Sequence, residues 1–242
     1  MKFLILGANS AMAFECAKIW ALKGDLILVA RDLKKLESHV AQLKSPHKVS
    51  YFEADLTDIN SAEVLWNELL KQGPFDVILT AHGLLKGENR AQEDFKTFME
   101  LTEVNFTSHV FWIFKAIKHF KEIGRGHLQV ISSVAGDRGK IRSMVYSSGK
   151  AGLNVFVEGL SLKCRRDNPG IYVSLIKPGY TDTPMTEKLK KNILFVSPAY
   201  IAQSIDANLK NKIPVVYTPS YWLLITKIIS NLPYFIYKRL KL

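Results

Sequence analysis

The chain has 242 residues, 48% of them hydrophobic, and this length fits one sizeable domain with a packed core. Its 33 basic and 22 acidic residues give a net charge of +11, which suits nucleic acid, a phosphorylated ligand or an anionic membrane. Since no basic run with interleaved aromatic residues stands out, nucleic acid ranks last among these three partners. The two cysteines, Cys16 and Cys164, indicate neither a disulfide framework nor a metal site.

The first predicted unit is a strand, a glycine turn and a helix. Phe3–Leu6 is an apolar run that ends at Gly7, and residues 10–22 have helical spacing. The run is too short for a signal peptide, so we expect a reducing, cytoplasmic setting. This geometry aims backbone N–H groups at a phosphate, although a plain strand-to-helix turn remains the alternative.

A second strand is predicted at residues 25–30, and it ends in Arg31-Asp32 before a helix at 33–43. In dinucleotide-binding folds an acidic residue at this point binds a free 2′-hydroxyl, whereas an arginine accommodates a 2′-phosphate. Arg31 therefore favours NADP, with NAD as the alternative. Asp32 is expected to cap the helix that follows it.

Two further strands are predicted at residues 49–53 and 75–80, the first followed by Asp55-Leu56 and the second by His82-Gly83. We interpret His82 as a stacked or hydrogen-bonded loop residue rather than a catalytic base. A long helical stretch at 95–123 then contains Asn105 among apolar neighbours. Asparagine competes for backbone hydrogen bonds, so a buried one in mid-helix indicates a specific local need.

The fifth strand, at residues 127–131, leads to the most informative segment of the chain. Ser132 and Ser133 follow the strand, and Tyr146 and Lys150 are four apart on a predicted helix at 146–164, so they share one face. A free tyrosine has a pKa of about 10, and a nearby ammonium is expected to lower it. The pair can therefore exchange a proton with a substrate.

A sixth strand at residues 171–176 ends in a Pro-Gly turn that continues to Thr183. We expect 185–195 to form a mobile segment over the substrate. Ser197-Pro198 then begins a helix at 197–209, and 215–217 is a last short strand. Strands that alternate with helices throughout predict an α/β fold with a doubly wound parallel sheet.

From Gly7 to Thr183, about three quarters of the chain, the motifs and their order resemble the classical short-chain dehydrogenase/reductase family. The resemblance implies a single Rossmann-type domain over residues 1–220 and hydride transfer between nicotinamide and a carbonyl or alcohol. Only the first glycine of the family's Gly-x-x-x-Gly-x-Gly turn is kept, with Ala11 and Ala13 at the other two positions.

The resemblance also assigns roles. Tyr146 transfers the proton, Ser133 polarises the substrate oxygen, Lys150 lowers the tyrosine pKa and binds the ribose, and Asn105 holds a helix distortion and a relay water. Ser133 is preferred over Ser132, because successive side chains on a strand point to opposite sides. The implied cofactor-binding residues are Gly7, Asn9, Ser10, Ala11, Met12, Arg31, Asp55, Leu56, His82, Gly83, Tyr146, Lys150, Pro178, Gly179, Thr181 and Thr183.

Residues 221–242 form an apolar and basic tail in which Ile225, Ile228 and Ile229 share a helical face. Lys227 and Pro233 interrupt the tail, so it falls short of the ~20 apolar residues of a spanning helix. It is expected either to lie on an anionic membrane surface, which would place the protein at the inner face of a membrane, or to pack on a subunit of a homodimer or homotetramer.

The leading hypothesis is an NADP(H)-dependent oxidoreductase acting on a small carbonyl or alcohol substrate. The alternative is a catalytically inactive dinucleotide-binding regulatory protein or a membrane-surface scaffold. The alanine-rich first loop, the Val-Ala-Arg-Asp segment and the apolar tail together are similar to a bacterial branch that includes reductases of lipid-linked keto-sugars. A lipid-linked substrate is therefore one expectation.

Overall fold

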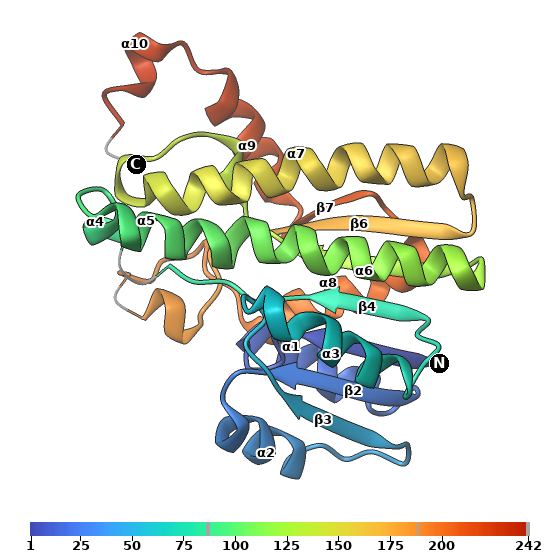
Figure 1. Ribbon diagram of the computed structural model, residues 1–242. Coiled ribbons are helices and arrows are strands. Elements are labelled where there is room, and N and C mark those ends of the chain that lie inside the picture. The colour runs from blue at the N-terminus through green and yellow to red at the C-terminus, as the bar shows by residue number, and fades with distance from the viewer. Residues whose placement is uncertain (86–87, 188, 241–242) are drawn as a thin grey trace.

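The computed structural model describes residues 1–85, 88–187 and 189–240, which form a parallel sheet with helices on both faces (Figure 1). The strand order is β3-β2-β1-β4-β5-β6-β7, and every neighbouring pair is parallel. The strands are β1 (Lys2–Leu6), β2 (Asp25–Ala30), β3 (Val49–Glu53), β4 (Val77–Thr80), β5 (Gly126–Ile131), β6 (Ile171–Pro178) and β7 (Val215–Thr218).

Helices follow the strands along the chain. The α-helices are α1 (Ala11–Trp20), α2 (Leu33–Ala41), α3 (Ile59–Leu70), α4 (Glu88–Ala91), α5 (Phe95–Thr102), α6 (Ser108–Ile123), α7 (Met144–Asp167), α8 (Pro198–Asn211), α9 (Tyr221–Asn231) and α10 (Tyr234–Tyr237). The tighter or wider helical turns are the π-helix η1 (Glu103–Thr107) and the 3₁₀ turns η2 (Val134–Asp137), η3 (Ile141–Ser143) and η4 (Pro184–Thr186).

The sheet separates two hydrophobic cores, as expected when both faces of a parallel sheet are covered. Alternate residues of one strand point to opposite faces, so Leu4 of β1 packs with α3, α6 and α7, while Phe3 packs with α1, α2 and α8. Both residues are fully buried. The predicted α/β doubly wound fold is therefore confirmed.

Local signals in the sequence set several helix boundaries. Asp32 accepts a hydrogen bond from the Lys35 N–H at 3.0 Å and caps α2 as predicted. Ser197 accepts from the Tyr200 N–H at 3.3 Å, ahead of Pro198 in the first turn of α8. The stretch predicted as one helix at 95–123 is helical throughout, but it changes from α-helix to the π-helix η1 around Asn105 and back again. The predicted helix distortion at Asn105 is therefore confirmed.

The strand order reverses between β1 and β4, because β2 and β3 lie on one side of β1 and the later strands lie beyond β4. At such a switch point the loops after the two strands diverge and leave a crevice at the carboxyl edge of the sheet. The fold therefore brings the loops after β1, β2, β4 and β5 to one place.

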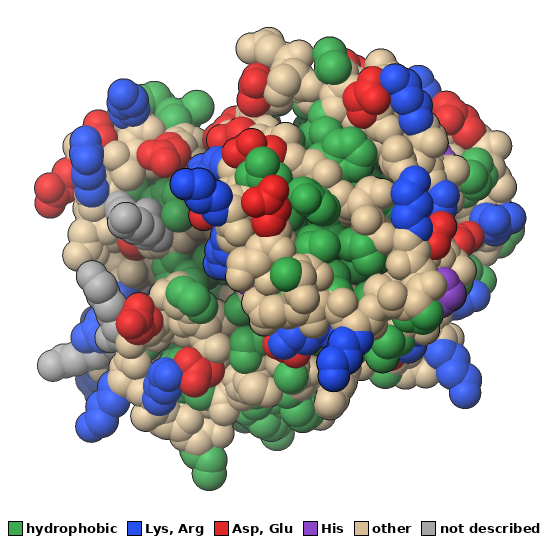
Figure 2. Space-filling view, turned by 90° about the horizontal axis from the view of Figure 1, so that it is seen from below, with side chains coloured by type: hydrophobic (Ala, Val, Ile, Leu, Met, Phe, Trp, Pro, Cys, Tyr) green, Lys and Arg blue, Asp and Glu red, His purple; other side chains and the backbone are tan. Residues whose placement is uncertain are grey.

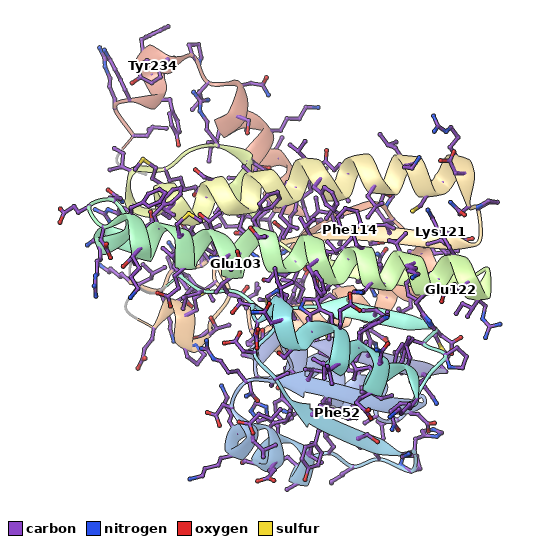
Figure 3. The ribbon with its side chains drawn as sticks, viewed as in Figure 1. Phe52, Glu103, Phe114, Lys121, Glu122 and Tyr234 are labelled. Atoms are coloured by element: carbon purple, nitrogen blue, oxygen red, sulfur yellow. The ribbon has the colours of Figure 1, made fainter. Side chains whose placement is uncertain are left out.

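The surface carries charge of both signs. On the face that Figure 2 shows, Lys and Arg side chains are interleaved with Asp, Glu and hydrophobic side chains. On α6 the labelled Phe114 lies on the outer surface, with 60% of its area exposed (Figure 3). The excess of positive charge is thus distributed over this face rather than gathered in a single basic stripe.

The tail forms α9 and α10, which extend beyond the sheet near the N-terminal end of α7 (Figure 1). Tyr234 marks α10 at the far end of the molecule from β3 (Figure 3). Across residues 1–85, 88–187 and 189–240, no helix is both long enough and apolar enough to cross a membrane.

Candidate active site

A cavity of about 340 Å³ lies at the carboxyl edge of the sheet, at the switch point. Side chains and backbone from the loops after β1, β2, β3, β4 and β5 surround it, together with the start of α7 and the turn η4. Its lining comprises Gly7, Asn9, Ser10, Ala11, Met12, Arg31, Lys35, Ala54, Asp55, Leu56, Thr57, Ala81, His82, Gly83, Leu84, Val104, Ile131, Ser132, Tyr146, Lys150, Thr183, Pro184 and Met185.

The turn after β1 has the shape of an anion site. Gly7 has a φ of 91°, and a Cβ there would lie 2.5 Å from the backbone nitrogen of His82, so only glycine fits. Ser10 at the start of α1 makes no side-chain cap, and the buried Asn9 Oδ1 has no partner among the described residues. Free N–H groups at a helix start suit a pyrophosphate, so this turn fits a dinucleotide.

The ends of β2 and β3 place charged groups at the edge of the cavity. The Arg31 side chain is 73% exposed and lies 3.8 Å from the Asp55 carboxylate. Burial raises the pKa of Asp55, but hydrogen bonds from Thr57 and the charge of Arg31 outweigh it and lower the pKa overall. Lys35 of α2 also lines the cavity. Lys35 was not among the predicted site residues, although its place one turn after Asp32 was a usable signal.

In the loop after β4, the ring of His82 stacks on that of His109, which belongs to α6. The rings of His82 and His109 lie 3.7 Å apart between centroids, and His82 Nε2 is 2.9 Å from the Ser108 hydroxyl. Burial lowers the pKa of His82 to about 3 and that of His109 well below its ordinary value, and Lys150 adds to both shifts. His82 is therefore neutral near pH 7, and its predicted role as a stacked loop residue agrees with this geometry.

Asn105 fastens this loop to the helix beside it. Its Nδ2 donates to the carbonyls of Leu84 at 2.7 Å and Leu101 at 2.9 Å, and its Oδ1 accepts from the Leu84 N–H at 3.0 Å. Asn105 is fully buried and does not line the cavity. Its side chain thus holds both η1 and the backbone next to Gly83.

Tyr146 and Lys150 come together as the sequence predicted, on the first turns of α7. The Lys150 ammonium lies 5.9 Å from the centre of the Tyr146 ring and donates to the Ile131 carbonyl at 3.4 Å. Ser133, whose hydroxyl accepts from the Ala135 N–H at 3.0 Å, makes a polar contact with Tyr146. Ser132 instead donates to Asn154 Oδ1 at 2.6 Å. The two serines thus have different partners.

The electrostatics of this pair correct one expectation. Burial raises the pKa of Tyr146 to about 12, and the contact with Ser133 only partly opposes the rise. Burial also lowers the pKa of Lys150 to about 7, which weakens the positive charge that was expected to lower the tyrosine pKa. The predicted lowering of the Tyr146 pKa is therefore wrong here, because burial of the hydroxyl is the largest influence on it and raises it.

Glu88 was missed by the sequence analysis, and it fixes the start of α7. Its carboxylate accepts from the Val145 N–H at 2.7 Å and the Tyr146 N–H at 3.0 Å, and only 7% of the residue is exposed. A carboxylate at a helix start stabilises it through hydrogen bonds and the helix dipole. Because Glu88 lies far from Tyr146 in sequence, no local pattern indicated the contact.

The segment after β6 divides between the cavity and the tail. Thr183 lines the cavity, whereas Pro178, Gly179 and Thr181 do not. A Cβ on Gly179 would lie 1.7 Å from the Trp222 indole nitrogen, so the tail packs directly on this glycine. Of the predicted site residues, Asn105 and Ser133 also lie outside the lining, and they contact it through Leu84 and Tyr146.

Comparison with known proteins agrees with this arrangement. The family model described as short chain dehydrogenase matches residues 2–194. The chain belongs to the short chain dehydrogenase family. It is 28% identical over 242 residues to an uncharacterized oxidoreductase of Mycobacterium tuberculosis, covering 98% of this chain and 96% of that one. The predicted family is confirmed, and the protein is an NAD(P)-dependent dehydrogenase/reductase.

Solved structures of the family share the fold. A short-chain dehydrogenase from Sphingobium yanoikuyae in complex with NADPH has a TM-score of 0.81 at 22% identity and covers 96% of both chains. A 3-oxoacyl-[acyl-carrier protein] reductase from Brucella melitensis in complex with NAD has a TM-score of 0.75 at 21% identity, covering 89% of this chain and 94% of that one. These family structures support a nicotinamide dinucleotide cofactor for the short chain dehydrogenase described here.

Proposed function

We propose that this short chain dehydrogenase is an NADP(H)-dependent reductase of carbonyl compounds. The observation that carries the proposal is the group of Ser133, Tyr146 and Lys150 at the carboxyl edge of the sheet, beside a turn that fits a pyrophosphate. The cofactor, when bound, supplies or accepts the hydride at its nicotinamide ring. In the proposed assignment Ser133 polarises the substrate oxygen, Tyr146 exchanges its proton with that oxygen, and Lys150 binds the ribose.

The protonation state of Tyr146 near neutral pH suits a proton donor in the reduction of a carbonyl. With a pKa of about 12, Tyr146 holds its proton and can donate it to an oxygen that gains negative charge. Oxidation would need tyrosinate, which the burial of this ring disfavours. The bonds of Asn105 to Leu84 and Leu101 support it as the residue that holds the surrounding backbone in place.

The preference for NADP is supported by two cations at the edge of the cavity. Arg31 and Lys35 both line it beside Asp55 and can face a 2′-phosphate. Asp32, the other candidate for a ribose contact, is occupied as the cap of α2. NAD is the alternative cofactor, and a comparison of kcat/KM for NADPH and NADH distinguishes the two.

We infer an amphiphilic substrate and further partners from the exposed apolar surface. Ile141, Met144 and Met185 lie around the start of α7 and η4, with 75%, 50% and 45% of their areas exposed. Of these three, Met185 lines the cavity. Exposed apolar side chains in this region suit a substrate with a hydrocarbon part, such as a lipid-linked carbonyl compound. Exposed residues of α6 and α7 support a homodimer or homotetramer, chiefly Phe114, Val155 and Leu162.

The tail supports contact with an anionic membrane, and so a cytoplasmic protein at the inner face of that membrane. Leu223, Leu224 and Ile228 of α9 have 53%, 64% and 56% of their areas exposed. No acidic residue occurs in residues 221–242, whereas Lys227, Lys238 and Arg239 do. An apolar face flanked by cations suits the interface of an anionic bilayer.

The experiment that tests the proposed chemistry compares the wild-type protein with Tyr146→Phe. NADPH oxidation is followed against a panel of carbonyl compounds that includes amphiphilic and lipid-linked ketones. We expect turnover by the wild type and a loss of at least about a hundredfold in kcat for Tyr146→Phe, the lower range for general acid catalysis. NADPH affinity should change little, because the ring stays. Turnover by the variant within a few-fold of wild type would contradict the assignment, and the inactive scaffold alternative predicts no turnover by either protein.

A further inference from the structure

The tail is joined to the loop that follows β5, and the side chain of Arg138 makes most of the joint. Its Nη1 donates to the main-chain carbonyls of Ile229, Ser230 and Leu232, at 3.1 Å for Ser230 and 2.8 Å for Leu232. Its guanidinium also lies 3.9 Å from the centre of the Tyr237 ring. The last carbonyls of a helix have no intrahelical partner, so Arg138 supplies one for α9.

Two bonds from the tail hold the neighbours of Arg138. The Ser230 hydroxyl donates to the Asp137 carbonyl at 3.2 Å, and the Tyr237 hydroxyl donates to the Gly139 carbonyl at 2.6 Å. Three consecutive residues, 137–139, are therefore held by α9 and α10. The tail thus packs against the loop of residues 132–139, which follows β5.

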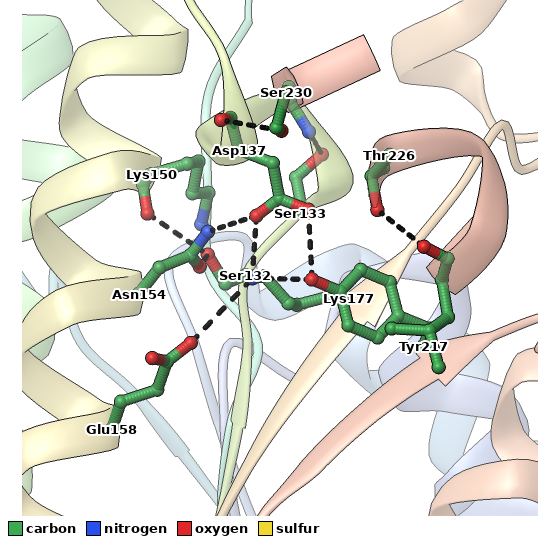
Figure 4. Close-up of polar contacts among 12 residues, drawn as sticks. Ser132, Ser133, Asp137, Lys150, Asn154, Glu158, Lys177, Tyr217, Thr226 and Ser230 are labelled. Atoms are coloured by element: carbon green, nitrogen blue, oxygen red, sulfur yellow. Dashed lines mark hydrogen bonds and ion pairs between the residues drawn. The ribbon is translucent and has the colours of Figure 1, made fainter. Parts of the chain in front are cut away.

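The same loop is held from the opposite side by the ends of β6 and β7 (Figure 4). The Asp137 carboxylate lies 2.5 Å from the Lys177 ammonium and accepts from the Tyr217 hydroxyl at 3.0 Å. Asn154 Nδ2 donates to Asp137 at 3.3 Å, and Asn154 Oδ1 accepts from Ser132 at 2.6 Å. Polar contacts thus run without a break from the serine segment to the tail.

The loop between these two anchors has little freedom to adjust. Ser133 caps the 3₁₀ turn η2, which ends at Asp137. A Cβ on Gly136 would lie 2.6 Å from the backbone carbon of Lys150, so the loop already touches α7. We therefore expect a shift at Arg138 to be transmitted along η2 to Ser133 rather than absorbed between them.

We propose that Arg138 is a positioning residue, which uses the C-terminal tail to hold Ser133 against Tyr146. Arg138 does not line the cavity, so its effect reaches the chemistry only through the loop. Within the described part of the chain no carboxylate lies at ion-pair distance from Arg138, which leaves the tail carbonyls as its main partners. The inference rests on the proposed function, because it needs Ser133 and Tyr146 to act together.

The test uses the full-length protein and a soluble carbonyl substrate. We expect Arg138→Ala to lower kcat about tenfold, equivalent to ~1.4 kcal/mol of transition-state stabilisation, with NADPH affinity unchanged. The kcat of Arg138→Lys should lie between those of the wild type and Arg138→Ala, because one ammonium cannot donate to all three carbonyls. Guanidinium ion at millimolar concentration should restore part of the kcat of Arg138→Ala, which a loss of general stability would not allow. Arg142→Ala removes an exposed arginine from the same loop region and is the matched control.

Tyr237→Phe gives an independent variant, since it removes only the hydroxyl bond to Gly139 and keeps the ring over Arg138. It should lower kcat two- to fivefold, roughly the value of one neutral hydrogen bond. If Arg138→Ala does not fold, wild-type kcat in both Arg138→Lys and Tyr237→Phe would overturn the proposal. Wild-type kcat in Arg138→Ala with an inactive Tyr146→Phe would refute the positioning role alone. Full activity of Tyr146→Phe would instead refute the proposed function.

Discussion

Cofactor choice should depend on Arg31, and the change Arg31→Ala removes the guanidinium while leaving the backbone of β2 intact. A charge-assisted hydrogen bond contributes about 1.5–3 kcal/mol, and each ~1.4 kcal/mol is tenfold in affinity. The Arg31 side chain is 73% exposed, so solvent screening places the expected effect at the lower end of that range. The ion pair with Asp55 at 3.8 Å is exposed and costs little to break. We therefore expect NADPH affinity to fall about tenfold.

The assay compares kcat/KM for NADPH and NADH in wild type and variant, with a carbonyl substrate held at saturation. NADH carries no 2′-phosphate, so its kcat/KM should stay within about twofold if Arg31 acts on that group alone. Lys35→Ala should repeat the pattern more weakly, because Lys35 also lines the cavity. Lys34→Ala is the matched control, since Lys34 is exposed on the same helix and does not line the cavity.

Raising the ionic strength gives a second measurement of the same contact. An exposed phosphate contact weakens as salt shortens the Debye length from about 10 Å at 0.1 M, so wild-type selectivity for NADPH should fall with salt. Arg31→Ala should show a flatter dependence. Equal losses for NADPH and NADH would indicate damage to the fold, and a wild-type preference for NADH would refute the assignment of Arg31.

The remaining predictions concern Lys150 and the tail. The pKa of Lys150 is lowered from 10.5 to about 7, so the unfolded chain binds more protons between these values and stability rises with pH across that window. Lys150→Met should therefore raise the free energy of unfolding most below pH 7, with a gain that shrinks toward pH 10. The same change should abolish turnover, because Lys150 is proposed to bind the ribose. A difference in the free energy of unfolding that does not depend on pH in denaturant titrations would contradict the stability prediction. The double variant Leu224→Ser/Ile228→Ser should lose salt-sensitive co-sedimentation with anionic vesicles, with Val64→Ser on α3 as the exposed apolar control. Two results together would contradict the membrane assignment: no binding of wild-type protein to vesicles at low salt, and a smaller oligomer for the double variant. They would assign the exposed face of α9 to contact with a second copy of the chain.

The fold was predictable because its signals are local. Strands such as residues 25–30 are apolar runs closed by turn residues, and the structure gives β2 the same bounds. Asp32 and Ser197 mark helix starts by their residue type, and both cap as expected. The order of these elements was sufficient to predict a doubly wound parallel sheet, since parallel strands joined by helices have few ways to pack.

The details of the site were less predictable because they depend on distant contacts. Glu88 reaches the start of α7 across a long stretch of sequence, and Arg138 reaches the tail across a longer one. The sign of the Tyr146 pKa shift depends on its burial, which the Tyr-x-x-x-Lys spacing does not encode. The short helices α4 and α10 lacked the length to give a periodic pattern.

The two roles proposed for the tail use different surfaces of the same segment. Trp222 and Thr226 face inward, with 4% and 6% of their areas exposed, and Arg138 binds the carbonyls at the end of α9. Leu224, Ile228 and Phe235 face outward, each with more than half of its area exposed. A bilayer can therefore cover the outer face without breaking the contacts that hold Ser133. Because the inner contacts persist, membrane attachment should leave turnover of a soluble carbonyl compound unchanged, while removal of the tail should reduce it.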